Sequence, residues 1–162
     1  MNELLAIEQI KQLKARYFRA LDTNDWPLLG SCLTEDFSAC FRGGMYCNTF
    51  TSRQAAVDYM SGHMSGAKRL SMHMSGQPEI ALITATTAEG FWHFQDMIID
   101  LETHYRLYGS GVYQDEYCID DGNWKICKSG YLRTFECIEP LSEEHRVMDN
   151  MFAVNDAVGA TR

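Results

Sequence analysis

The spacing of apolar residues near the N-terminus predicts one long amphipathic helix. Between residues 7 and 26, apolar residues recur at steps of three and four, which places them on one helical face. These residues are Ile7, Ile10, Leu13, Tyr17 and Leu21. Neither glycine nor proline interrupts the segment. Charged residues such as Lys14 and Arg16 are expected mostly to face away from this apolar side, which packs on the core.

Two shorter helices and a hairpin are predicted next. Asp25 precedes a Trp-Pro pair, and an acceptor side chain followed by an early proline is typical of a helix start, so a short helix should run to about Leu33. Residues 36–41 and 45–50 are β-type segments joined by an Arg-Gly-Gly turn, which indicates a hairpin. A third helix, residues 53–60, should follow a capping Thr or Ser and end near a glycine.

The second half of the chain is predicted to be β-structure. The expected strands are residues 69–74, 79–85, 88–99, 111–119 and 124–138. Turn-forming residues at 75–78 and 120–123 separate them, and residues 100–110 are interpreted as a strand end followed by a loop. Helices followed by long strands predict an α+β domain, in which a strongly curved sheet wraps one side of the helices. A pocket at the open end of such a sheet suits a small molecule.

Length and charge narrow the class of protein. A chain of 162 residues is expected to form one domain, residues 1–140, with a tail, residues 141–162. In the tail, apolar residues at helical spacing between residues 147 and 152 suggest a short lid or an intersubunit helix. The net charge of -8 argues against nucleic acid or an anionic membrane as partner. With no candidate membrane span and no export signal, a cytoplasmic protein is expected.

Neither the cysteines nor the histidines are spaced as metal ligands. The six cysteines include no C-x-x-C pair, and in a chain without an export signal they are expected to be reduced core residues. Four histidines show no ligand spacing with a second His, Cys or carboxylate on a shared face, namely His63, His93, His104 and His145. We therefore expect no metal site and no disulfide framework.

Two charged residues, Asp96 and Arg133, fall on strand faces that also carry aromatic side chains. These aromatic residues are Trp92 and Phe94 beside Asp96, and Tyr131 and Phe135 beside Arg133. An unpaired buried charge is very costly, so each must be paired or must meet a polar ligand. One interpretation is a structural ion pair between them, with His73 a polar residue near a strand end. The other is a functional site, since catalytic groups also occupy such positions.

Four stretches give the chain a resemblance to a known family. They are IEQIKQLKARYFRALDTNDWPLL, RLSMHMSGQPEI, AEGFWHFQD and GVYQDEYCIDDGNWKICKSGYLRTFE. In this order they resemble the SnoaL-like family of the nuclear-transport-factor-two-like (NTF2-like) superfamily, and within it the bile acid 7α-dehydratases more than scytalone dehydratase or hexachlorocyclohexane dehydrochlorinase. The likeness covers residues 7–136. It implies a cone-shaped α+β barrel with a curved mixed or antiparallel sheet, an N-terminal helix and an internal cavity.

The resemblance also implies site residues. The family dehydratases use a tyrosine and an aspartate on the first helix, a histidine in an S-M-H-M strand, an aspartate in the next strand and an arginine in a G-Y-x-R strand. The matching positions here are Tyr17, Asp22, His73, Asp96 and Arg133. The aromatic residues Trp92, Phe94, Tyr131 and Phe135 are expected to contact substrate. The family further implies a homo-oligomer, with a trimer favoured over a dimer. Residues 45–60, which would shape the pocket, match the family poorly.

These residues lead to a mechanistic hypothesis. A cofactor-independent dehydratase would remove water from a small hydrophobic hydroxy-carbonyl compound, steroid-like or polyketide-like, with His73 as base and Asp22 fixing its tautomer. Tyr17 would donate a hydrogen bond to the carbonyl oxygen. Asp96 would protonate or hold the leaving hydroxyl, and Arg133 would orient Asp96 or stabilise negative charge. The roles of Asp96 and Arg133 are interchangeable in this hypothesis. The alternatives are a ketosteroid-type isomerase, a polyketide cyclase, or a non-catalytic small-molecule-binding protein.

Overall fold

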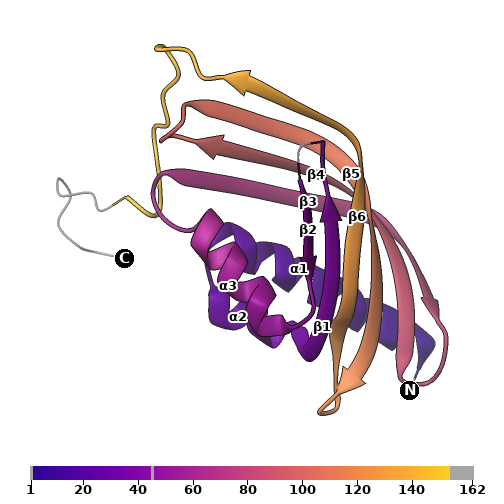
Figure 1. Cartoon of the computed structure of the whole chain (residues 1–162). Coiled ribbons are helices and arrows are strands. Elements are labelled where there is room, and N and C mark those ends of the chain that lie inside the picture. Colours follow the sequence, from indigo (N-terminus) through magenta and orange to yellow (C-terminus); the bar gives the residue numbers. More distant parts are fainter. Residues whose placement is uncertain (1, 45, 154–162) are drawn as a thin grey trace.

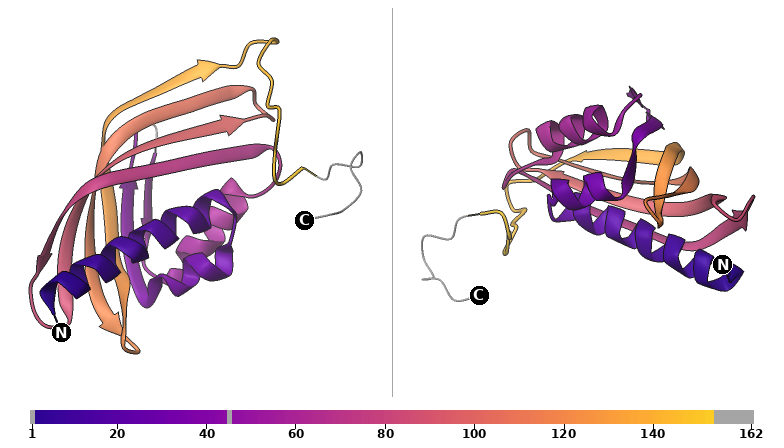
Figure 2. Two further views of the ribbon diagram at one scale, coloured as in Figure 1. Left: turned by 180° about the vertical axis from the view of Figure 1, so that it is seen from behind. Right: turned by 90° about the horizontal axis from the view of Figure 1, so that it is seen from below.

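The helices gather at one end of a long curved sheet. A computed structural model describes residues 2–44 and 46–153. In these residues the elements are α1 (Glu3–Asp22), α2 (Trp26–Ser31), β1 (Leu33–Arg42), β2 (Cys47–Phe50), α3 (Arg53–Met64), β3 (Arg69–Leu82), β4 (Thr87–Asp100), β5 (Tyr105–Asp120) and β6 (Asn123–Pro140). Helix α1 lies across the inner face of the sheet, and α2 and α3 pack beside it (Figures 1 and 2).

The sheet is mixed and open. Its six strands lie in the order β2-β1-β6-β5-β4-β3, and β1 pairs in parallel with β6 while the other neighbours are antiparallel. The predicted α+β class and curved sheet are confirmed, but β2 and β3 remain free edges, so the sheet forms a cone-like trough and not a closed barrel. The strands arch over α1 (Figure 1).

Local capping explains where the helices begin. The Asn2 side chain accepts from the Leu4 amide, and the Asp25 side chain accepts from the Leu28 amide, each over 3.0 Å. The predicted apolar face of α1 is buried, but Lys14 is buried as well, with a fully inaccessible side chain. The expectation that Lys14 mostly faces away from the core is therefore wrong. Helix α3 also continues past Gly62 to Met64.

Two strands run further than predicted. The turn signal at residues 75–78 does not end β3; the strand continues through it with a shift in register between Gly76 and Glu79. Proline is tolerated there because β3 is an edge strand. Strand β5 begins at Tyr105, so most of the predicted loop at residues 100–110 is strand.

A bulge in β6 reverses the predicted face of one aromatic residue. Ser110 pairs with Phe135 and Gly111 pairs with Arg133, which leaves Thr134 as an extra residue. An extra residue switches the alternation of faces, so Glu136 joins Arg133 on the inner face while Phe135 points outward and is 52% exposed. The prediction that Phe135 shares the face of Arg133 is therefore wrong.

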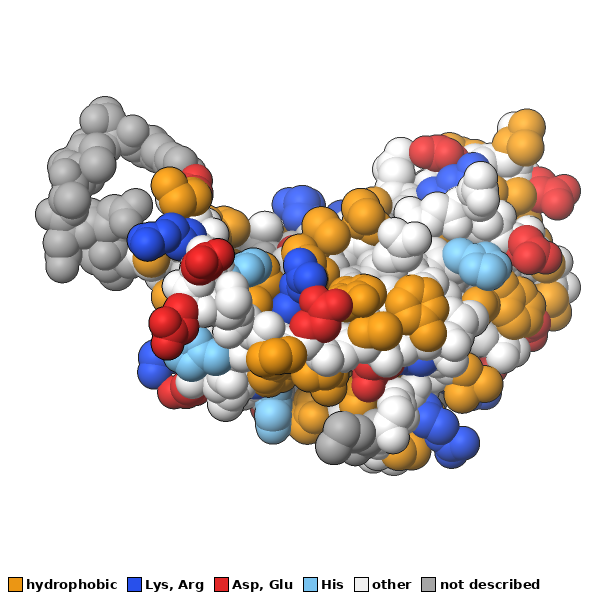
Figure 3. Space-filling view, turned by 90° about the horizontal axis from the view of Figure 1, so that it is seen from above, with side chains coloured by type: hydrophobic (Ala, Val, Ile, Leu, Met, Phe, Trp, Pro, Cys, Tyr) orange, Lys and Arg blue, Asp and Glu red, His pale blue; other side chains and the backbone are white. Residues whose placement is uncertain are grey.

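The segment after β6 returns toward the helices. Residues 141–153 form turns and extended chain without a helix, and the Asn150 side chain donates to the Ala67 carbonyl over 2.8 Å. The suggested helix at residues 147–152 is not formed, and residues 154–162 lie outside the described part. Among the helices of the described residues, none is both long and apolar enough to cross a membrane. Seen from above, the surface mixes hydrophobic side chains with charges of both signs (Figure 3).

Candidate active site

The last residue of α1 is fastened to the edge strand β3. Asp22 Oδ1 accepts from the Ser71 hydroxyl over 2.9 Å, and Oδ2 accepts from the His73 backbone amide over 2.8 Å. The His73 ring adds a third contact, with Nδ1 2.6 Å from Asp22 Oδ1. Alternation along β3 turns Ser71 and His73 to the same inner face, which is why one carboxylate reaches both.

This contact orients the His73 ring. A carboxylate only accepts hydrogen bonds, so Nδ1 donates to Asp22, and in the neutral ring this tautomer leaves the lone pair on Nε2. The ring is also stacked on Phe18, with centroids 5.8 Å apart and planes 5° apart. The His73 side chain is only 8% exposed. Orientation, tautomer and burial together suit a general base.

Asp96 and Arg133 form a second polar pair opposite His73. His73 and Asp96 are direct cross-strand partners, so their side chains leave the inner face about 5 Å apart at Cβ. Arg133 Nη1 and Nη2 each donate to one oxygen of Asp96 over 2.7 Å, a bidentate arrangement. Burial lowers the pKa of Arg133, but the hydrogen bonds with Asp96 outweigh it and raise the pKa overall, so the guanidinium stays charged.

Two glycines in β5 provide the space for this pair. A Cβ on Gly109 would lie 2.8 Å from Arg133 Nη1, and a Cβ on Gly111 would lie 2.6 Å from the Phe94 ring. Real side chains do not approach that closely, so glycine is required at both positions. The ring of Phe94 in turn lies under the guanidinium, whose central carbon is 5.5 Å from the ring centroid.

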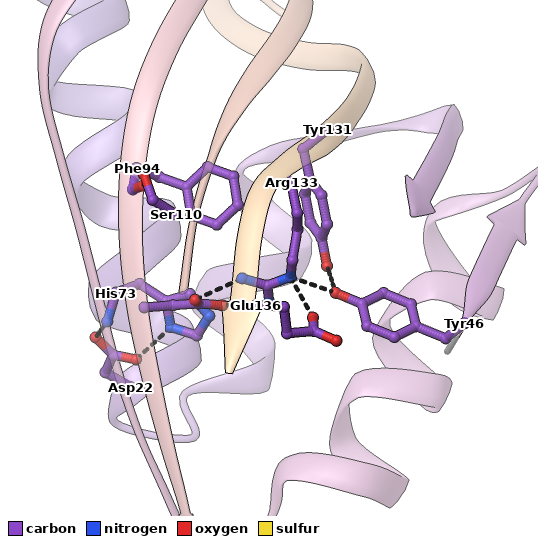
Figure 4. Close-up of polar contacts among 9 residues, drawn as sticks. Asp22, Tyr46, His73, Phe94, Ser110, Tyr131, Arg133 and Glu136 are labelled. Atoms are coloured by element: carbon purple, nitrogen blue, oxygen red, sulfur yellow. Dashed lines mark hydrogen bonds and ion pairs between the residues drawn. The ribbon is translucent and has the colours of Figure 1, made fainter. Parts of the chain in front are cut away.

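Arg133 also has neighbours that the sequence did not indicate. Arg133 Nε donates to the Tyr46 hydroxyl over 3.0 Å, and that hydroxyl is 2.7 Å from the Tyr131 hydroxyl. Glu136 Oε2 is 2.6 Å from Arg133 Nε as an ion pair. Asp22, His73, Arg133, Glu136 and Tyr46 follow one another across the inner face (Figure 4). Arg133 thus lies between two carboxylates, one on each side.

Aromatic rings line the interior beneath these polar groups. Tyr17, Phe18, Phe94, Tyr113 and Tyr131 lie at ring-centroid separations of 4.7–5.8 Å. Burial raises the phenol pKa of Tyr17 well above its ordinary value, and the hydroxyl therefore stays protonated and remains a hydrogen-bond donor. Trp92 lies further along β4, where its indole N–H donates to the Tyr117 hydroxyl over 2.8 Å.

A separate ion pair lies deeper in the core. Lys14 Nζ is 2.7 Å from Asp115 Oδ2, and both side chains are inaccessible to solvent. The Tyr117 and Ser129 hydroxyls also donate to this carboxylate, over 2.8 Å and 2.7 Å. The ammonium lies 3.6 Å from the centroid of the Tyr113 ring. This network therefore connects α1 to β5 and β6 directly below the candidate site.

The structure thus brings together four of the five predicted residues in two pairs, Asp22 with His73 and Asp96 with Arg133. Tyr17 lies in the aromatic floor and is not among the hydrogen-bonded partners of either pair. Sequence reasoning missed Tyr46 and Glu136. Gly111, at the start of the predicted strand 111–119, is a usable signal of close approach, but no local signal reveals the β6 bulge.

No metal centre is visible in residues 2–44 and 46–153: no three or more His, Cys, Asp or Glu side chains are arranged to hold an ion. A pocket of about 550 Å³ does open beside the Arg133–Glu136 pair, at the β1–β2 turn. A larger depression of about 710 Å³ lies elsewhere, on the outer face of the sheet around Phe91 and Leu132. The first of these pockets shares Arg133 and Glu136 with the candidate site.

Comparison with known proteins identifies the family. A model of the SnoaL-like domain matches residues 2–129, and the chain belongs to this family. Its fold is similar to a hexachlorocyclohexane dehydrochlorinase, LinA-type3 from Novosphingobium barchaimii, with 19% identity over 89% of this chain and 95% of that one and a TM-score of 0.73.

Two further structures extend the likeness. A scytalone dehydratase-like protein from Novosphingobium aromaticivorans is 18% identical over 89% of this chain and 96% of its own, with a TM-score of 0.73. A Mycobacterium tuberculosis protein of unknown function is 24% identical over 97% of this chain and 82% of its own, with a TM-score of 0.67. At these identities the similarity concerns the NTF2-like fold. A dehydrochlorinase and a scytalone dehydratase-like protein are thus among the structural neighbours of this chain.

Proposed function

We propose that this protein is a cofactor-independent lyase that eliminates water from a small hydrophobic compound carrying a hydroxyl group β to a carbonyl. The observation that carries the proposal is the His73–Asp22 pair, in which a half-buried carboxylate holds Nδ1 and leaves Nε2 free. The fold is similar to that of a dehydrochlorinase, an enzyme named for an elimination reaction, and this similarity supports the same reaction type.

The elimination divides among the residues as follows. His73 Nε2 takes the proton from the carbon next to the carbonyl, and Asp22 stabilises the imidazolium that forms. Tyr17 donates a hydrogen bond to the carbonyl oxygen as it gains negative charge. The imidazolium then returns its proton to the departing hydroxyl, so that water leaves and the carbon–carbon double bond remains. A proton moves and no electrons are exchanged with a cofactor.

The roles of Asp96 and Arg133 follow from their pairing. Because Arg133 occupies both oxygens of Asp96, we assign Asp96 to holding the guanidinium in position. Arg133 then presents positive charge to the departing hydroxyl, which eases the loss of that group. The sequence left open whether Asp96 or Arg133 acts on the leaving hydroxyl. Assigning that role to Arg133 requires no proton on the Asp96 carboxylate, which already accepts two hydrogen bonds from arginine.

The first test is product mass together with a base variant. Incubation with a panel of hydroxy-ketones, hydroxysteroids and aromatic polyols should give one product lighter by the mass of water. His73→Ala should lower kcat by about 10²–10⁴-fold, as expected for loss of a general base, and Asp22→Asn should be nearly as damaging. His93→Ala is the matched control, because His93 lies on the adjacent strand and is exposed on the outer face.

The outcomes separate the candidate functions. A product of unchanged mass would replace elimination by isomerisation or ring closure at the same base. Full activity of His73→Ala on the true substrate would end the proposed mechanism. Ligand binding without turnover across the panel would favour a carrier or binding protein.

A further inference from the structure

The pocket at the β1–β2 turn has an unusual polar wall. We call it the Glu136 pocket; its volume is about 550 Å³ and its walls include Arg42, Gly43, Gly44, Arg133, Glu136 and Ile138. Leu132 and Phe135 complete the apolar part of the lining. The two glycines keep the turn side free of side chains: a Cβ on Gly44 would stand 3.5 Å from Glu136 Oε1. The carboxylate therefore faces open space beside a backbone turn.

Glu136 lacks the hydrogen bonds that a buried carboxylate normally has. Its side chain is 10% exposed, and within the described part of the chain Oε2 is buried without a hydrogen-bond partner. Arg133 Nε is only 2.6 Å away, but its N–H donates to the Tyr46 hydroxyl instead. The guanidinium charge beside Oε2 compensates that oxygen. The other oxygen, Oε1, faces Gly44 across the pocket, and it is the oxygen that a hydroxyl donor entering the pocket can reach.

The local charge favours a neutral donor over a cation. The charged residues of the lining are Arg42, Arg133 and Glu136, so the pocket wall carries one more positive than negative charge. A cation therefore gains no net attraction there. Most of the other lining is apolar or backbone. A hydroxyl group on an apolar skeleton fits both parts of the pocket.

We propose that Glu136 is the acceptor for a hydroxyl group of the ligand, bound in the Glu136 pocket. This inference rests on the proposed lyase function, because only a lyase would make the bound ligand a substrate. The substrate class is then a hydrophobic carbonyl compound with a hydroxyl group at the end away from His73. Arg133 separates the two ends, because it contacts Asp96 on the His73 side and Glu136 on the pocket side.

The test compares three probes of one skeleton by isothermal titration calorimetry: 1-tetralone, 6-hydroxy-1-tetralone and 6-methoxy-1-tetralone. The wild-type protein should bind the hydroxy compound about tenfold more tightly than 1-tetralone, as a hydrogen bond to a charged group predicts. The methoxy compound should gain nothing, because it is larger but has no donor. Equal affinity for the hydroxy and unsubstituted compounds in the wild-type protein overturns the proposal without any variant.

Variants then assign the preference to one side chain. Glu136→Ala should abolish it, and Glu136→Gln, which keeps shape and an acceptor but loses the charge, should retain part of it. Glu116→Gln is the matched control, because this glutamate lies on the outer face in an exposed pair with Lys128. A tenfold preference that survives in Glu136→Ala overturns the proposal.

The result is independent of turnover. His73→Ala should keep the preference for the hydroxy compound, since it alters only the opposite end of the site. If the wild-type protein prefers the hydroxy compound but eliminates water from no substrate, the lyase function is overturned and the assignment of Glu136 is kept. If it eliminates water but shows no such preference, the assignment of Glu136 is overturned and the lyase function is kept.

Discussion

At the scale of the residue, Asp22 occupies an electrostatically unfavourable position. It is the last residue of α1, where the helix dipole disfavours negative charge by about 0.3–1 kcal/mol. Hydrogen bonds from Ser71 and from the His73 amide, together with the His73 ring contact, offset that cost. An acid kept at this place against the dipole is explained by what it does to His73, because capping would favour a basic or neutral residue.

The buried Lys14–Asp115 pair yields a prediction about stability. Lys14→Met removes one charge and leaves Asp115 buried without its counterion, so the free energy of unfolding should fall by about 3–5 kcal/mol. The double variant Lys14→Met, Asp115→Asn has no buried charge and should recover part of the loss. Urea unfolding of the two proteins measures this. A loss below about 1 kcal/mol for the single variant would show that water reaches the carboxylate.

At the scale of the element, a single bulge in β6 decides what the site contains. Without the extra Thr134, strict alternation would place Phe135 inside with Arg133 and would turn Glu136 to solvent. The bulge exchanges an apolar residue for a carboxylate beside the guanidinium. The Glu136 pocket therefore depends on the register of β5 and β6.

The turn between β4 and β5 gives a pH prediction. Burial by itself raises the pKa of Asp100, but the Thr103 amide and Arg69 outweigh it, and the pKa is lowered to about 2. A carboxyl with a lowered folded-state pKa stabilises the protein above its unfolded pKa, and this contribution is lost as the pH falls from about 4 to about 2. It amounts to about 2 kcal/mol.

The corresponding measurement is urea unfolding across pH 7 to 2 for the wild-type protein and Asp100→Asn. The wild-type protein should lose more stability than the variant between pH 4 and pH 2, so that their difference narrows. Parallel curves over that interval would mean that the carboxyl has the same pKa in both states.

At the scale of the whole molecule, the outer face of the sheet carries exposed apolar side chains. Met72, Met74, Phe91 and Leu132 are each 40–64% exposed. They lie on the face opposite His73 and Arg133, and three depressions open among them. Exposed apolar surface of this kind is typical of association sites.

We expect a homo-oligomer, with a trimer favoured, as the family resemblance implied. Light scattering after size-exclusion chromatography should give a multiple of the 18.5 kDa chain. Leu132→Glu should shift the mass toward the monomer, whereas Leu4→Glu on the exposed side of α1 should not. A monomer at all concentrations would contradict the expectation.

Much of the fold follows from local rules that the chain satisfies within a few residues. The apolar repeat and its cap define α1, the acceptor and proline define the start of α2, and the Arg-Gly-Gly turn defines the β1–β2 hairpin. The strand that begins at Arg69 continues through its predicted turn, because a proline-containing bulge and a turn have the same residue preferences. Only the pairing with β4 distinguishes the two.

The sequence alone determined the family, the α+β class and the residue types available for chemistry, because periodicity, capping and motif order are written along the chain. Only the tertiary structure decided which of those residues touch. Asp22 meets His73 across 51 residues and Arg133 meets Asp96 across 37, distances that only the pairing of strands can bridge. Burial of Lys14 and the inward turn of Glu136 arise in the same way, since strand register and bulges are set by contacts between elements.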